Sequence, residues 1–177
     1  MRGDSSAPLV LLSRGETMTQ ELGAAWSRSW AAATAEPLAV LSLAGPLGAG
    51  KTQLAKGVVA GLGGDPHEVT SPTFTLLDIH ATPGGEVHHF DFYRLDSAED
   101  AFDVGLETSL AAPTAGTRRI VLIEWASRVA AWLPPQTQLR EVQLEHVEET
   151  VRRQSWHGLT TAERAALRHV VGDPAPS

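Results

Sequence analysis

The stretch Gly45-Pro-Leu-Gly-Ala-Gly-Lys-Thr52 decides the fold expected of this chain, because it matches the full pattern G-x-x-x-x-G-K-[ST] of a phosphate-binding loop. In such a loop the glycines let successive backbone N–H groups point inward, and the helix that follows adds the positive end of its dipole. The lysine reaches the β- and γ-phosphates of a nucleotide, and the hydroxyl of the last residue becomes a ligand of Mg²⁺. The nucleotide-binding candidates are Gly45, Pro46, Leu47, Gly48, Ala49, Gly50, Lys51 and Thr52.

The flanks of this loop fit the motif. Residues 38–44 read as a buried strand, and Leu54, Val58 and Leu62 recur every four residues downstream, as one face of a helix requires. The chain has only two lysines, Lys51 and Lys56, and otherwise uses arginine. One of these two lysines, Lys51, therefore occupies the position at which a flexible side chain with a compact positive charge would contact a phosphate.

Length and composition set the broad class. The 177 residues, 42% of them hydrophobic, predict a single domain over residues 1–171 and a flexible tail at 172–177. A formal charge of −7 disfavours strong binding of a nucleic-acid backbone over an extended surface of this chain. The absence of cysteine excludes disulfides and thiol chemistry. No apolar run approaches the ~20 residues of a membrane span, and the start does not resemble a signal peptide, so we expect a cytoplasmic protein with no membrane association.

Strand and helix patterns alternate along the chain. Thr17 is expected to cap the first helix, with Gln20 completing a capping box. A loop at 81–85 is expected to join two strands as a hairpin. This order around a phosphate-binding loop predicts a three-layer α/β fold of the P-loop NTPase type, with a mostly parallel central sheet and an antiparallel hairpin. The expected strands are 9–12, 38–44, 73–80, 86–93, 119–123 and 139–147. The expected helices are 17–33, the one after the loop, a short one from Ser97, and 160–171, which is expected to be capped at Thr160.

Glu124 is the main candidate for a second metal ligand. It follows four aliphatic residues at 120–123, and a phosphate-binding loop needs a carboxylate at the end of a neighbouring strand to hold Mg²⁺. The alternative is an acid at an ordinary strand end, and the intact loop favours the metal role.

Asp91 is the other acidic candidate. Strand alternation places it on one face with His89 and Tyr93, and an acid among aromatic residues is costly without a partner or a function. The alternative is a carboxylate paired with Arg94 or Arg119, and residue patterns leave both readings open. His88 and His89 are adjacent in a strand, point to opposite faces and are expected to be structural.

The segment Ser71-Pro-Thr-Phe-Thr75 stands where nucleotide-dependent proteins carry a switch. The hydroxyl of Thr73 is a candidate for contact with the γ-phosphate or Mg²⁺. The alternative is a plain strand start, because Pro72 favours an extended residue before it.

Together these stretches resemble the TsaE (YjeE) family of bacterial P-loop ATPases. The specific matches are Ser71-Pro-Thr-Phe-Thr-Leu76 and His89-Phe-Asp-Phe-Tyr-Arg-Leu95, and the resemblance spans residues 17–134. It implies a place in the machinery that makes threonylcarbamoyladenosine beside the tRNA anticodon, with ATP and Mg²⁺ bound. It also implies that the chain acts with the TsaD and TsaB proteins and contacts tRNA only indirectly, through the complex with them. The resemblance implies Thr52 and Glu124 for Mg²⁺, Lys51, Asp91 and Trp125 for activity, and Thr17 near the adenine.

One departure from the family concerns the residues after Trp125. The family often has a second glutamate shortly after the tryptophan, whereas this chain continues Ala126-Ser-Arg128, so Arg128 becomes a candidate for lining the nucleotide.

Three rival functions are considered. A GTPase would use an Asn-Lys-x-Asp motif, which a chain without asparagine cannot contain. A small-molecule P-loop kinase and an adaptor that binds ATP without hydrolysing it are the remaining alternatives.

Overall fold

The computed structural model describes residues 7–33, 36–95, 100–135 and 139–172. The expected start of a helix at Ser97 and most of the expected tail lie outside these ranges. In chain order the elements are β1 (Leu9–Arg14), α1 (Gly15–Ala32), β2 (Leu38–Ala44), α2 (Lys51–Gly61), the 3-10 helix η1 (Pro66–Glu68), β3 (Leu77–Thr82), β4 (Gly85–Asp91), α3 (Asp100–Asp103), α4 (Leu106–Leu110), β5 (Arg119–Glu124), the 3-10 helix η2 (Ala126–Trp132), β6 (Leu139–His146), β7 (Val151–His157) and α5 (Thr161–Val170).

Within the described ranges, seven strands form one sheet in the order β1-β7-β6-β2-β5-β4-β3. The central strands β6, β2, β5 and β4 are parallel, which confirms the predicted mostly parallel sheet. The β3–β4 pair is the predicted antiparallel hairpin, and its connection is shorter than expected because Thr82 already pairs with Gly85. A second antiparallel part, β6–β7–β1, was not predicted.

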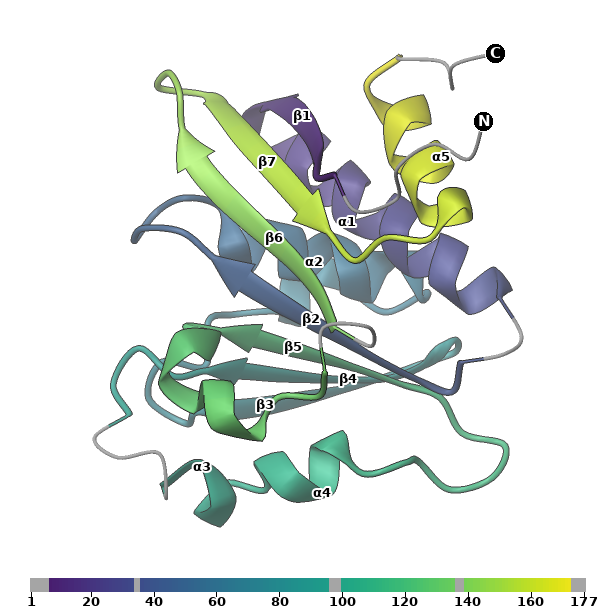
Figure 1. The fold of residues 1–177 in the computed structure, drawn as a ribbon, viewed down its shortest axis with the longest axis vertical. Coiled ribbons are helices and arrows are strands. Elements are labelled where there is room, and N and C mark those ends of the chain that lie inside the picture. The colour runs from purple at the N-terminus through teal and green to yellow at the C-terminus, as the bar shows by residue number, and fades with distance from the viewer. Residues whose placement is uncertain (1–6, 34–35, 96–99, 136–138, 173–177) are drawn as a thin grey trace.

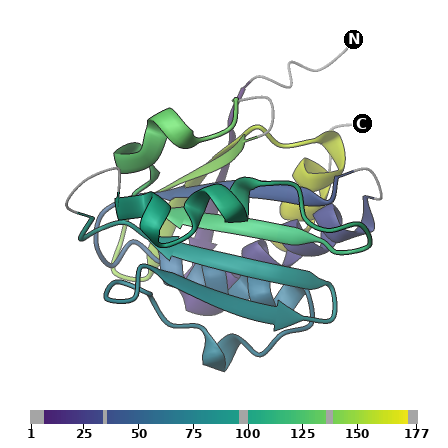
Figure 2. The ribbon, with the colours of Figure 1, turned by 90° about the horizontal axis from the view of Figure 1, so that it is seen from below.

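Helices cover both faces of the sheet (Figures 1 and 2). On one face α1, α2 and α5 pack over a core that contains Trp26, Trp156 and Leu122. On the other face lie α3, α4 and η2, over a smaller core that contains Phe90 and Val121. Neighbouring residues of β5 thus enter opposite cores, which explains why its sequence is continuously apolar rather than alternating. The predicted three-layer architecture is confirmed.

The two helices α1 and α2 approach each other closely at glycines. A Cβ atom on Gly57 would lie 2.0 Å from the carbonyl oxygen of Gln20, and one on Gly61 would lie 2.5 Å from that of Ala24. Glycine is the only residue that this separation admits. The contact holds α1 beside the helix that follows the phosphate-binding loop.

The predicted cap of α1 at Thr17 is wrong, whereas that of α5 is confirmed. Helix α1 begins at Gly15, directly after β1, and the side chain of Arg14 at the N-cap position makes no capping hydrogen bond to the described residues of the first turn. The turn needs no capping side chain because Gly15 has φ of 82° and its N–H donates to the carbonyl of Thr150. At α5, Thr160 and Glu163 form a reciprocal capping box.

The strand predicted from Thr73 begins only at Leu77. Residues Thr73–Thr75 lie in a turn closed by the N–H of Leu76, which donates to the carbonyl of Pro72 at 2.7 Å. Leu76 then adopts a left-handed backbone with φ of 63°. Among the described residues, no helix combines the length and apolar character needed to cross a membrane.

Candidate functional site

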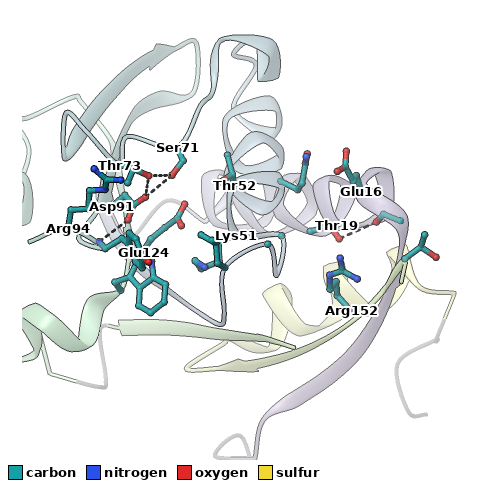
Figure 3. A pocket seen from close by; sticks show the side chains of 18 of the residues that line it. Glu16, Thr19, Lys51, Thr52, Ser71, Thr73, Asp91, Arg94, Glu124 and Arg152 are labelled. Carbon is teal, nitrogen blue, oxygen red and sulfur yellow. Dashed lines mark hydrogen bonds between the residues drawn. The ribbon is translucent and has the colours of Figure 1, made fainter. Parts of the chain in front are cut away.

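A pocket of about 660 Å³ opens where the parallel strands β2, β4 and β5 end. This edge is where open α/β sheets bind ligands. Figure 3 shows the labelled side chains converging on the pocket from several segments. The lining residues are Gly15, Glu16, Thr19, Leu47, Gly48, Gly50, Lys51, Thr52, Gln53, Ser71, Thr73, Phe74, Asp91, Tyr93, Arg94, Glu124, Trp125, Glu149, Thr150 and Arg152.

The loop between β2 and α2 has the shape of a phosphate cradle. Gly45 has φ of 140°, and a Cβ atom there would lie 2.4 Å from the carbonyl oxygen of Leu144. Gly50 has φ of 101° and forms the N-cap of α2, where no side chain caps the first turn. The start of α2 is therefore open to a ligand that supplies negative charge. Of the predicted loop residues, Gly45, Pro46 and Ala49 are not among the lining residues.

Lys51 is folded back onto its own loop. Its Nζ donates to the carbonyl oxygens of Gly45 and Pro46, both at 3.0 Å, and lies 5.0 Å from the ring centroid of Trp125. Burial lowers the pKa of Lys51, and the nearby carboxylates of Glu124 and Asp91 oppose that shift. The cation thus lies between the phosphate loop and the two acids.

The two predicted acids are neighbours in the sheet. Asp91 ends β4 and Glu124 ends β5, and the two residues are register partners in the parallel pair. Both are buried. Glu124 Oε1 lies 3.0 Å from Nε2 of His89. Two buried carboxylates beside Lys51 form an acidic wall of the pocket (Figure 3).

Asp91 is held by hydrogen bonds from the 71–76 segment and its own strand end. Its Oδ2 accepts from the hydroxyls of Ser71 at 2.6 Å and Thr73 at 2.7 Å, and its Oδ1 accepts from the N–H of Tyr93 at 3.0 Å. Burial would raise the pKa of Asp91, but these hydrogen bonds outweigh it and the pKa lies below its usual value.

The alternative ion pairs for Asp91 are not formed. Arg119 instead pairs with Glu86, with its Nη2 atom 3.3 Å from Oε2. The guanidinium of Arg94 lies over the ring of Phe74, 4.5 Å from the centroid.

Trp125 adopts a strained backbone at the edge of the pocket. Its φ of 59° and ψ of 37° are left-handed values that a bulky residue rarely adopts. Its ring packs against Tyr93 at a centroid distance of 5.1 Å and lies near Lys51. Strain of this kind clusters at functional sites.

Besides Gly45, Pro46 and Ala49 of the loop, two more predicted nucleotide-binding residues, Thr17 and Arg128, lie outside the pocket lining. Thr17 is exposed on the first turn of α1, whereas Gly15, Glu16 and Thr19 line the pocket. A helix turns by about 100° per residue, so these neighbours need not share a face. Arg128 is exposed, and its Nη1 atom donates to the carbonyl of Leu95 at 2.7 Å.

Sequence reasoning missed the turn between β6 and β7. Glu149 and Thr150 of this turn and Arg152 at the start of β7 line the pocket. Arg152 also donates to the carbonyls of Glu148 and Glu149, so its side chain stabilises the turn. The charged run at 145–153 overlaps the start of β7 and masked that strand, and without that strand the turn could not be placed near the loop.

The donor set of the pocket suits Mg²⁺. Thr52 offers a hydroxyl and Glu124 a carboxylate, and both are hard oxygen ligands. Mg²⁺ is typically held by one or two carboxylates and the phosphates of its substrate rather than by a protein cage. Within the described part of the chain, no three His, Cys, Asp or Glu residues form such a cage.

Comparison with known proteins identifies the family. Residues 13–155 match the family described as "Threonylcarbamoyl adenosine biosynthesis protein TsaE". Proteins named "tRNA threonylcarbamoyladenosine biosynthesis protein TsaE" are similar to this chain. The one from Rickettsia bellii is 36% identical over 68% of this chain and 78% of its own length. The protein from Treponema pallidum is 45% identical over 55% of this chain and 67% of its own length. The protein from Mycobacterium leprae is 36% identical over 71% of this chain and 78% of its own length.

A solved structure has the same fold. The crystal structure of YdiB from Bacillus subtilis superposes with a TM-score of 0.63, covering 94% of this chain and 96% of that one at 21% sequence identity. The family match extends from the end of β1 into β7 and includes the phosphate-binding loop and both acids. On this match and these relatives, the chain belongs to the TsaE family.

Proposed function

We propose that this chain is an ATP-binding and ATP-hydrolysing accessory protein of tRNA threonylcarbamoyladenosine biosynthesis, acting in the cytoplasm with TsaD and TsaB. The family's description and the names of the relatives support the pathway. The observation that carries the ATPase is the pocket itself. It brings the phosphate-binding loop, Lys51 and Thr52 together with the register-paired acids Asp91 and Glu124.

The loop is the part that would hold the triphosphate. Backbone N–H groups at the start of α2 carry no side-chain cap, and they would donate to phosphate oxygens. Lys51 would exchange its two loop carbonyls for the β- and γ-phosphates, which compensates the lost hydrogen bonds with charge-assisted ones. Mg²⁺, held by Thr52 and Glu124, would neutralise charge on the same oxygens.

Asp91 would act through the 71–76 segment. Its carboxylate already accepts from two hydroxyls and one N–H, and its own N–H donates to the carbonyl of Leu76. It therefore fixes the position of Thr73, whose side chain lines the pocket. In this role Asp91 orders the segment that closes over the γ-phosphate.

The rim of the pocket would receive the partner proteins. Leu47 and Phe74 line the pocket and are 75% and 81% exposed, and Tyr93 beside them is 41% exposed. Exposed apolar side chains gathered at one place are typical of an interaction site. The net charge of −7 agrees with contact to tRNA through the complex rather than by this chain alone.

A partner would also supply catalytic charge. Arg94 is stacked on Phe74, and Arg152 is bonded to turn carbonyls. An arginine provided in trans raises turnover in related phosphoryl-transfer sites by about 10³–10⁵. We therefore expect slow hydrolysis by the isolated chain and faster hydrolysis in the complex.

Steady-state phosphate release at fixed ATP, with and without TsaD–TsaB, tests this proposal. Glu124→Gln should lower release by roughly 10–100-fold and leave ATP binding in the absence of metal close to wild type. The control is Glu145→Gln, since that side chain is half-exposed on β6 and does not line the pocket. Fast turnover by the isolated chain that partners do not change would contradict the accessory role.

A further inference from the structure

His89 is a fully buried polar residue in the middle of the sheet. It lies on β4 two residues before Asp91, and its register partner on β5 is Leu122. Side chains two residues apart on a strand share a face, so His89 lies diagonally opposite Glu124 on that face. This position puts the imidazole directly behind the acidic wall of the pocket.

The hydrogen bonding of His89 is directed at Glu124. Nε2 of the ring lies 3.0 Å from Oε1 of the carboxylate. A carboxylate can only accept, so a hydrogen bond between these two atoms requires the tautomer of His89 that carries its hydrogen on Nε2. The other nitrogen, Nδ1, is buried and has no hydrogen-bond partner among the described residues. A ring held only for packing would gain nothing from this buried, unsatisfied nitrogen.

The adjacent histidine makes the contrast clear. His88 points to the other face, where Nδ1 lies 2.8 Å from the hydroxyl of Ser109 and Nε2 lies 3.3 Å from Glu86. Both of its nitrogens have partners, and none of these groups lines the pocket. His88 therefore has the contacts of a structural histidine, whereas His89 contacts Glu124, which lines the pocket.

We propose that His89 is a positioning residue for Glu124. Its N–H occupies Oε1 and fixes the carboxylate rotamer, which leaves Oε2 for the metal ion or for water bound to it. Hydrogen bonds of this kind orient ligating carboxylates and raise metal affinity. The proposal rests on the proposed metal role of Glu124, and it adds a residue that touches neither nucleotide nor metal.

The test is Mn²⁺ affinity of the protein–ADP complex, measured from the electron paramagnetic resonance signal of free Mn²⁺. His89→Leu, which keeps the bulk and removes the donor, should weaken Mn²⁺ binding by roughly 10-fold or more. His89→Gln restores an N–H donor and should bind Mn²⁺ more tightly than the leucine variant. ADP binding in EDTA should be the same for all three proteins, because the cradle is backbone. A merely structural role would instead change ADP affinity and melting temperature without a specific loss of Mn²⁺.

A double-mutant cycle identifies the route of the effect. In a Glu124→Gln background, His89→Leu should cause no further loss of Mn²⁺ affinity, because the two residues act as one unit. If the two substitutions lower Mn²⁺ affinity additively, or if His89→Leu binds Mn²⁺ like wild type, the positioning role of His89 is overturned while the metal role of Glu124 stands. Wild-type affinity in Glu124→Gln itself overturns the metal role, and with it both this inference and the metal part of the proposed function.

A second measurement needs no His89 variant and serves if the leucine protein does not fold. Two-bond ¹H–¹⁵N spectra of the imidazole should show the Nε2–H tautomer in the wild-type protein. The Nε2 resonance should shift in Glu124→Gln and stay unchanged in the control Glu145→Gln. A ring protonated at Nδ1 with Nε2 bare, or an Nε2 resonance insensitive to Glu124, overturns the proposal.

Discussion

Asp91→Asn should destabilise the protein by about 2 kcal/mol at neutral pH. The carboxylate accepts from two hydroxyls at Oδ2, at 2.6 and 2.7 Å. Asparagine keeps the shape but not the charge, and its Oδ1 can still accept from the N–H of Tyr93. A hydrogen bond to a charged group contributes about 1.5–3 kcal/mol and a neutral one about 0.5–1.5, so each hydroxyl loses about 1 kcal/mol. No further penalty is expected, because Ser71 is exposed and Thr73 is half-buried, so both hydroxyls can reach water.

The assay is urea unfolding followed by tryptophan fluorescence. In a domain of this size about 2 kcal/mol corresponds to a loss of roughly 4–8 °C in melting temperature. Asp103→Asn, at an exposed position on α3, is the matched control and should stay within about 0.5 kcal/mol of wild type. Hydrogen exchange at the N–H of Leu76, which closes the 71–76 turn, should become faster in Asp91→Asn only.

The pH dependence follows from the lowered pKa of Asp91. The folded protein binds this proton less readily than the unfolded chain, whose Asp91 has the ordinary pKa near 3.8. The stabilisation is therefore complete above about pH 3.8 and is lost as pH falls through the lower, folded pKa. The difference between wild type and Asp91→Asn should shrink over that window. A difference that persists unchanged into acid, or a variant as stable as wild type at pH 7, would refute the reasoning.

Three further predictions follow from single contacts. Lys51→Ala should weaken ATP binding by about 1.5–3 kcal/mol, or roughly 10–150-fold in isothermal titration, with an unchanged circular dichroism spectrum. Lys56→Ala, the change at the only other lysine, should bind ATP like wild type; equal loss in both variants would show that the loop is not the site. Gly57→Ala should cost about 1–3 kcal/mol in urea unfolding, because its new Cβ meets the carbonyl of Gln20 and separates α1 from α2; wild-type stability would show that the helices adjust freely. Arg140→Leu should cost about 3 kcal/mol, because the buried carboxylate of Glu163 loses its cationic partner and, among the described residues, keeps only the bond from the N–H of Thr160. Arg153→Leu breaks the half-exposed pair with Glu145 and should cost under about 1 kcal/mol, so a similar cost for both variants would contradict the difference in burial.

The sequence by itself determined the phosphate-binding loop and its two flanking elements. Gly45 and Gly50 are required by backbone angles within the loop, and Leu54 and Val58 face the core from the first turns of α2. The backbone angles of the loop and the four-residue spacing of the helix involve residues close in the chain. The strand ending at Glu124 and the capping box at Thr160 are local in the same sense. Such features can be predicted without knowing what packs against them.

Helix and strand starts were less well predicted where another segment sets them. Thr17 has the residue type of a cap, yet α1 starts earlier because β1 runs into Gly15, whose N–H bonds to Thr150 of the β6–β7 turn. Thr73 reads as a strand, yet its hydroxyl bonds to Asp91 and the chain turns before β3. In both cases a contact between distant segments outweighs local preference.

Only the tertiary structure decided which residues meet in the pocket. The sequence placed Asp91 and Glu124 each near a strand end, but their adjacency follows from β4 lying beside β5. The same holds for Arg152, which reaches the pocket because β6 pairs with β2 and turns back as β7. The interaction of His89 with Glu124 joins positions 35 residues apart. The order of strands depends on burying both faces of the sheet at once, and that condition involves the whole chain rather than any one stretch of it.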